Sequence, residues 1–143
     1  MESLIILNCS AYSKNLVDVL KIFQQIGWSI YNQQGKVEYL PIGDDDEYDW
    51  QCEEMSEIKL YDVISKKIGN KEQIGVNLFY KNGIEGISIM AYSTDQITLG
   101  ISVNRRIVKE KYTDMIWYLE NIIYKFFDIG VRLLSYKLEE YED

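Results

Sequence analysis

The chain has 143 residues, a length that fits one domain with a sizeable core. Its 47% hydrophobic and 27% charged residues are ordinary values for a globular protein and argue against a disordered one. The 23 acidic and 15 basic residues give a net charge of −8, which argues against nucleic-acid backbones and anionic membranes as partners. We therefore expect a single domain over residues 1–143 whose charge favours solubility or a basic protein partner.

The N-terminal part predicts a strand, a helix and a hairpin. Residues 2–9 are a short apolar run rich in β-branched side chains, as in a buried strand. Apolar residues then recur at helical spacing between Ser13, the expected N-cap, and Gly27, a typical helix stop. Residues 28–31 and 37–40 flank a Gln-Gly turn signal and predict a hairpin.

The middle of the chain predicts a helix followed by an antiparallel meander. Ser56 is the expected cap of a second helix that ends at Gly69. Apolar residues then alternate with polar ones over three strands, at residues 74–80, 87–91 and 97–103, and Asn82-Gly83 marks the first turn between them. Such alternation indicates a sheet with one buried face.

The last part predicts an aromatic helix and one more strand. Thr113 is the expected cap of a helix over residues 114–129, followed by a strand within residues 131–138. The helix has a narrow polar stripe and is otherwise apolar, so we expect burial over most of its circumference. The stripe consists of Asp114, Tyr118, Asn121, Lys125 and Asp128. The whole order indicates an α+β fold, with a mainly antiparallel sheet of about five to six strands and three helices packed against it.

The residue types exclude most catalytic chemistry. The chain has no histidine, which removes Ser-His-Asp and Cys-His sites and every histidine metal site. Its two cysteines, Cys9 and Cys52, have no metal-binding or redox spacing, and no phosphate-binding glycine loop is present. Lysine, tyrosine and carboxylates remain usable acids and bases, but the sequence singles out no pair of them. We expect no cofactor, no metal and no catalysis.

Residues 43–54, here called the acidic segment, hold seven of the 23 acids. The segment has no helical or strand period, so we expect a surface loop. A calcium loop needs glycine at its sixth position and glutamate at its twelfth. Counting from Asp44 these positions hold Asp49 and Met55, and counting from Asp45 they hold Trp50 and Ser56, so neither register fits.

The acidic segment is the predicted binding surface for a partner. Acids speed the approach of a basic protein, while a tyrosine and a tryptophan can anchor it once water is excluded. The candidate residues are Asp44, Asp45, Asp46, Glu47, Tyr48, Asp49, Trp50, Glu53 and Glu54. The alternative is that Trp50 folds back onto the core and the acids serve only solubility. The acids of the C-terminus either widen this surface or lie far from it.

The acidic segment belongs to a compact, histidine-free α+β domain. The same domain has a predicted meander whose last strand, residues 97–103, leads into Asn104, Arg105 and Arg106 and then into an aromatic helix. In this format the chain resembles the small immunity proteins of bacterial polymorphic-toxin and contact-dependent growth inhibition systems. The resemblance implies a cytosolic inhibitor that binds a cognate toxin domain and blocks its active site or an exosite. Many such toxins are nucleases with basic clefts, where an acidic loop would stand in for phosphates.

The N-terminus lacks the basic start and long apolar core of a secretion signal, and no stretch is long enough to cross a bilayer, so we expect a cytosolic protein. The rival function is a small-molecule-binding or regulatory domain, without catalysis, that associates with itself through an exposed sheet edge. A neighbouring gene for a large secreted protein with a toxin-like C-terminus would favour immunity, and an operon of metabolic enzymes would favour the rival.

Overall fold

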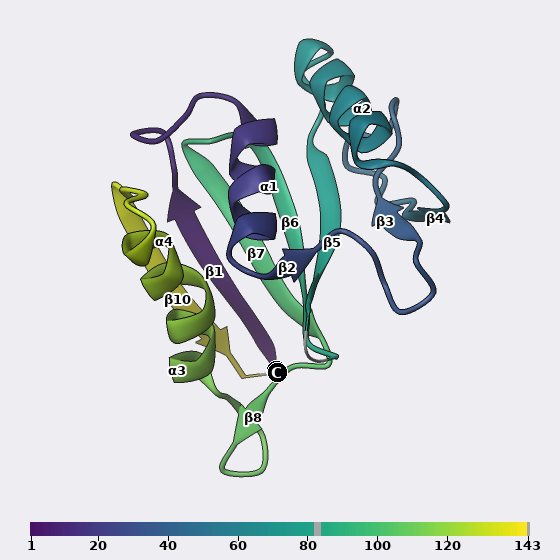
Figure 1. Cartoon of the computed structure of the whole chain (residues 1–143). Helices are drawn as coiled ribbons and strands as arrows, with labels where there is room; N and C mark the ends of the chain where they lie inside the picture. The colour runs from purple at the N-terminus through teal and green to yellow at the C-terminus, as the bar shows by residue number, and fades with distance from the viewer. Residues whose placement is uncertain (82–83, 143) are drawn as a thin grey trace.

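A computed structural model describes residues 1–81 and 84–142 of the chain (Figure 1). Within them eight strands form one sheet, in which seven follow the order β10-β1-β7-β6-β5-β3-β4 and β2 pairs with β5. All pairs are antiparallel. The strands are β1 (Glu2–Asn8), β2 (Trp28–Ser29), β3 (Val37–Tyr39), β4 (Gln51–Glu53), β5 (Ile74–Tyr80), β6 (Gly86–Ser93), β7 (Gln96–Val103) and β10 (Ser135–Tyr141), with a separate hairpin of β8 (Ile107–Val108) and β9 (Tyr112–Thr113).

The predicted α+β class, with three helices and a mainly antiparallel sheet, is confirmed, but the expected five to six strands are too few. The additional pairing comes from short segments. The strands β2, β3 and β4 have two or three residues each, too few for a period of two to be recognised. β4 lies inside the acidic segment, where we had expected a loop without strand. The predicted turn at Asn82 and Gly83 lies outside the described residues.

The predicted hairpin of residues 28–31 and 37–40 is only partly present. A single bridge joins Tyr31 to Val37, whereas β2 pairs with the end of β5 and β3 lies between β4 and β5. Trp28, Val37 and Tyr39 are all buried in this arrangement. Burial against the central sheet therefore prevails over the local turn signal.

The three helices start and end near their predicted bounds. The first is α1 (Leu16–Gln25) and the second is α2 (Glu57–Gly69), which Ser56 caps as expected. The third consists of α3 (Met115–Tyr118), a π-helical segment η1 (Leu119–Ile123) and α4 (Tyr124–Asp128). Two caps differ from expectation, since Asn15 caps α1 and Asp114 caps α3. The side-chain oxygens of Asn and Asp accept backbone N–H groups at a helix start as well as Ser and Thr hydroxyls do.

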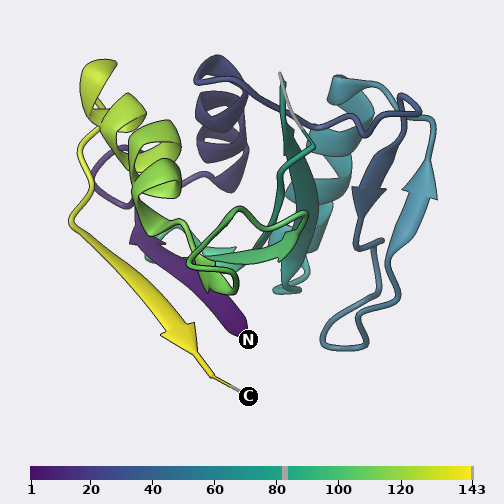
Figure 2. The same ribbon diagram turned by 90° about the horizontal axis from the view of Figure 1, so that it is seen from below.

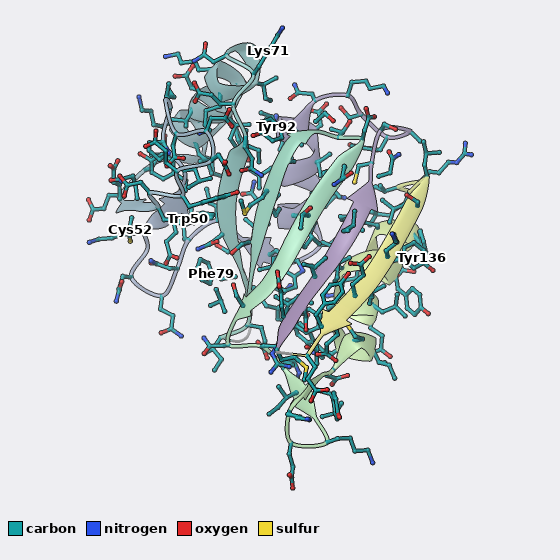
Figure 3. The ribbon with its side chains drawn as sticks, turned by 180° about the vertical axis from the view of Figure 1, so that it is seen from behind. Trp50, Cys52, Lys71, Phe79, Tyr92 and Tyr136 are labelled. Carbon is teal, nitrogen blue, oxygen red and sulfur yellow. The ribbon has the colours of Figure 1, made fainter. Side chains whose placement is uncertain are left out.

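The core lies between the helices and one face of the sheet (Figure 2). Alternate residues of the central strands point into it, such as Ile5 in β1, Ile89 in β6 and Leu99 in β7, each at most 3% exposed. Helix α2 packs beside α1 and against β5. The other face of the sheet carries more of the partly exposed side chains and is turned to the viewer in Figure 3.

The third helix is less buried than predicted. Tyr118, assigned above to the polar stripe, is fully buried, and its hydroxyl accepts the backbone N–H of Arg106 at 3.0 Å. Conversely, Ile116, Tyr124 and Phe127 are 67%, 46% and 45% exposed. A π-helical turn takes one residue more than an α-helical turn, so η1 changes which side chains of α4 face the core. The prediction assumed an uninterrupted α-helical period.

Residue 75 in β5 must be glycine, because the neighbouring side chains leave no room for a Cβ atom. A Cβ atom there would lie 2.5 Å from Cδ1 of Leu40 and 3.1 Å from Cη2 of Trp50. Leu40 is 1% exposed and has little room to move. The backbone of β5 and the segment that follows β3 are therefore in close contact at this point.

We expect Gly75→Ala to lower the free energy of unfolding by about 1–3 kcal/mol, because the added methyl overpacks this contact. Gly100→Ala in β7 is the matched control, since the nearest atom to its Cβ would be 3.8 Å away, an ordinary contact. Urea denaturation of the two variants measures the difference. Equal losses would contradict the contact between β5 and the Leu40 and Trp50 side chains.

Candidate functional site

The acidic segment joins β3 to β4 at one end of the strand order (Figure 1). Its last residues form β4, which pairs only with β3 among the described strands, with Glu38 opposite Cys52. The segment is thus attached to the sheet at the edge that lies farthest from β10.

Asp44 organises the segment from inside. It is only 4% exposed, and its carboxylate accepts the backbone N–H groups of Glu47, Tyr48 and Asp49 at 2.7–3.1 Å. A carboxylate that collects three consecutive amides fixes the path of the backbone around it. Asp44 therefore shapes the segment rather than presenting a charge at its surface.

Lys67 of α2 holds the same turn from the other side. It is 1% exposed, and its Nζ donates to the carbonyl oxygens of Pro41 at 2.7 Å and Asp44 at 2.6 Å. The Glu72 carboxylate lies 3.6 Å from this Nζ and also accepts the backbone N–H of Gly43. A buried ammonium group is tolerated only when such partners replace water. Lys67 thus ties α2 to the start of the acidic segment.

The pKa of Asp44 reflects these contacts. Burial raises it, but the three backbone N–H bonds and the nearby Lys67 outweigh burial and leave the pKa below its usual value of 3.8. The neighbouring Asp45 is exposed and also has a lowered pKa, chiefly because Tyr92 donates to it at 2.7 Å. The same hydrogen bond raises the pKa of Tyr92 to about 12. Asp45 additionally accepts the N–H of Gln73, which ties the segment to the start of β5.

The remaining carboxylates of the segment face solvent. Asp46, Glu47, Asp49, Glu53 and Glu54 are all exposed. None of the five forms an ion pair with a lysine or arginine in residues 1–81 and 84–142. One of them, Glu53, accepts the hydroxyl of Tyr39 at 3.0 Å. These five carboxylates therefore present negative charge that is not ion-paired with any lysine or arginine of the described residues.

Tyr48 stands among these charges in an unusual backbone conformation. Its side chain is 48% exposed, and its pKa is raised, chiefly by the hydrogen bond to Asp46. Tyr48 and Asp46 have φ values of 58° and 77°, in the left-handed region. Aspartate tolerates this region, but tyrosine adopts it at a cost and only where the surrounding contacts impose it. The bonds to Asp44 impose it here.

Trp50 lies on the sheet rather than in solvent. It is partly buried, and its ring edge faces Gly75 of β5. Figure 3 shows Trp50 beside β5 on the side of the sheet away from the helices. Only part of the indole ring is accessible, so Tyr48, at 48%, is the more exposed of the two aromatic side chains of the segment.

Sequence reasoning missed the residues that hold the segment in place. Lys67, Glu72, Gln73 and Tyr92 all lie outside residues 43–54, and none was a candidate. One signal was available, since Lys67 follows Leu60 and Ile64 at helical spacing on the buried side of α2. A lysine in an apolar stripe is seldom buried without a specific acceptor.

The acids of the C-terminus do not extend this surface. They lie in or beside β10, at the opposite end of the strand order from β4. Glu140 accepts from Thr113 and lies 3.7 Å from Arg105, while Glu142 pairs with Lys111 at 2.8 Å. Arg105 and Lys111, which lie between β7 and the third helix, therefore supply counter-charges to the C-terminal acids. The last acid, Asp143, lies outside the described residues.

A separate cleft of about 540 Å³ opens where β2 and β3 meet the end of β5. Tyr31, Phe79 and Tyr80 line it together with side-chain amides. A chain of hydrogen bonds supports its wall, in which Glu38 accepts from Asn32 and Asn77, and Ser88 donates to Asn77. The volume lies in the range of small-molecule sites. No group of three or more acidic or cysteine side chains among the described residues is arranged to hold a metal ion.

We expect Lys67→Met to lower the free energy of unfolding by roughly 2–4 kcal/mol, because it leaves two carbonyl oxygens and Glu72 without their cation. The neighbouring Lys66 is the matched control, since it is 59% exposed and pairs with Asp62 one turn earlier. Lys66→Met should cost less than about 1 kcal/mol. Similar losses for both variants in chemical denaturation would reject the structural role of Lys67.

Acid should also destabilise the segment through Asp44. Because its pKa is lowered on folding, its contribution is present above its ordinary pKa of 3.8 and is lost as the pH falls through the lower folded value. Asp44→Asn should therefore lower the Tm at neutral pH and flatten its fall below about pH 4. Asp46→Asn, at an exposed carboxylate of the same segment, is the control. Parallel Tm profiles for Asp44→Asn and the unaltered protein would contradict this role.

None of the helices in the described residues is long and apolar enough to span a membrane. Comparison of the chain with protein-family models, with curated proteins and with solved structures found no match. The geometry of the acidic segment and of the cleft is therefore the basis on which a function can be proposed.

Proposed function

We propose that this chain is an inhibitor of the immunity type, which binds a basic protein, a cognate toxin domain, through the exposed part of the acidic segment. The observation that carries the proposal is a set of exposed carboxylates, five of which form no ion pair with a lysine or arginine in the part of the chain that the structure describes, on a segment whose backbone is fixed by internal hydrogen bonds. The proposed contact residues are Asp45, Asp46, Glu47, Tyr48, Asp49, Glu53 and Glu54. Asp44 positions them, and Trp50 adds the accessible part of its ring.

Rigidity supports a binding role for this segment. A flexible acidic loop would lose conformational entropy when a partner binds, whereas a loop already held by Asp44, Lys67 and Tyr92 loses much less. Solubility alone requires negative charge but no defined conformation. The left-handed backbone at Tyr48 also supports a binding role, because strained backbone conformations cluster at functional sites.

Charge and ring would have separate roles in the complex. The carboxylates would accelerate association with a basic surface, and their effect would weaken as salt increases. Tyr48, once buried by the partner, would supply an anchor of the kind that dominates interface energies. A nuclease toxin with a phosphate-binding cleft fits this chemistry, and such a toxin would be neutralised in the cytosol.

A second candidate function is binding of a small molecule, which the cleft beside Tyr31 and Phe79 favours. Its aromatic and amide lining suits a flat polar ligand. The cleft borders β4 through Glu38, but none of the acidic candidate residues lines it, so the two functions are separable by mutation. Binding of a small molecule that variants of the cleft abolish and variants of the segment retain would favour the second function.

Co-expression tests the proposal. The probe is the C-terminal domain of the secreted protein encoded beside this gene, produced alone or together with the chain. We expect the domain to stop growth alone and growth to recover when the chain is present. A neighbourhood of metabolic genes without such a protein, or continued toxicity in the presence of soluble chain, would overturn the proposal.

Reversing Asp46, Glu47 and Asp49 to lysine together should slow association with this domain by at least about tenfold, because these exposed acids attract the partner. The Tm should change by only a few degrees, since all three side chains are exposed and none forms an ion pair with a lysine or arginine among the described residues. Reversal of Asp95, Glu110 and Glu120 alters the net charge equally and serves as the control. Equal association rates for the two triple variants, measured by surface plasmon resonance, would exclude the segment as the binding surface.

A further inference from the structure

The other end of the sheet offers a second interaction surface. The strand β10 ends the strand order, and among the described strands it pairs with β1 alone. Figure 2 shows it at the margin of the sheet, without another element on its outer side. The outer N–H and C=O groups of such a strand form a template for pairing with a strand of another molecule.

A positive and a negative side chain of β10 lie on the same face of the sheet, and their order decides which register of pairing is favourable. Lys137 and Glu139 lie opposite Ile6 and Leu4 of β1 and share the sheet face away from the helices. Their charged groups are 3.5 Å apart, and the Lys137 side chain is 67% exposed. The residue between them, Leu138, points to the helix side.

Two copies of β10 related by a two-fold axis would pair antiparallel and continue the sheet. Residues that lie directly opposite each other in an antiparallel pair point to the same face of the sheet. The two-fold axis must therefore lie midway between one residue of β10 and the same residue of the partner. An axis at Leu138 pairs the strand along its whole length and places Lys137 opposite the partner's Glu139, and the reverse pair forms by symmetry. An axis at Lys137, Glu139 or Glu140 instead places like charges opposite each other, which is destabilising.

Exposed rings border the same edge. Phe127 of α4 contacts Tyr124 and Tyr136, with ring centroids 6.4 and 6.2 Å apart, and the three side chains are 43–46% exposed. We call these three residues the aromatic patch. Figure 3 shows Tyr136 at the outer margin of β10. A second molecule that extends the sheet from β10 would come to lie beside the aromatic patch and remove apolar surface from water.

We propose that β10 and the aromatic patch form the interface of a symmetric homodimer, with the two-fold axis at Leu138 and two cross-strand pairs of Lys137 with the partner's Glu139. The acidic segments then lie at the two far ends of a continuous sheet. This dimer is independent of the proposed inhibitor function, and a dimer that inhibits would bind two toxin domains.

Sedimentation velocity over a range of micromolar concentrations tests the dimer. The unaltered chain should reach twice its mass of 16.8 kDa. Lys137→Glu opposes two glutamates at each pair, and Glu139→Lys opposes two lysines, so each variant alone should associate at least about tenfold more weakly. An equal mixture of the two should dimerise again, because every cross-strand pair in the mixed dimer joins opposite charges. Lys59→Glu, at an exposed residue of α2, is the control and should dimerise normally.

Recovery in the mixture also shows that both variants are folded. A chain that remains monomeric at every concentration would overturn the proposal. So would single variants that dimerise as tightly as the unaltered chain, or a mixture that stays monomeric, since either result excludes the register centred on Leu138. Inhibition of the toxin domain by a strictly monomeric chain would leave the proposed function intact while rejecting the dimer.

Discussion

The buried ammonium group of Lys67 is the interaction on which the proposed binding surface depends. It reaches from the last turn of α2 to the carbonyl oxygens of Pro41 and Asp44, where the chain leaves β3 and turns into the acidic segment. The Pro41 oxygen also accepts the backbone N–H of Asp44 at 3.1 Å, so Lys67 is the donor that the Asp44 carbonyl oxygen would lose. The buried charge of Lys67 thus fixes the position of the carboxylates that the acidic segment exposes on the surface.

Asp44 and Lys67 divide the work of holding the segment. Lys67 binds carbonyl oxygens, while the Asp44 carboxylate binds the amides that follow, so both kinds of backbone group are satisfied within a few residues. Tyr92 and Gln73 add bonds from the sheet to Asp45. The outcome is a surface whose carboxylates and Tyr48 need little rearrangement to meet a partner, which is the condition for fast and tight association.

The long periodic elements could be predicted from the sequence, and the short or irregular ones could not. The meander strands β5 to β7 alternate over seven or eight residues, which is enough to define a face. β4 could not be recognised within the acidic segment, because its strand conformation depends on pairing with Val37–Tyr39 rather than on its own composition. In the third helix the π-helical segment changes which side chains of α4, such as Phe127, face the core, and no periodic template contains such an insertion. The acids were recognised as a group, but the buried position of Asp44 depends on contacts far away in the sequence.

The most direct test of the central claim is hydrogen–deuterium exchange of the chain with and without the neighbouring gene's toxin domain. If the exposed acids are the docking surface, backbone amides within residues 45–54 should exchange more slowly in the complex, while those of β10 and of the cleft remain unchanged. Slowed exchange confined to β10 or to the cleft, with residues 45–54 unaltered, would contradict the account.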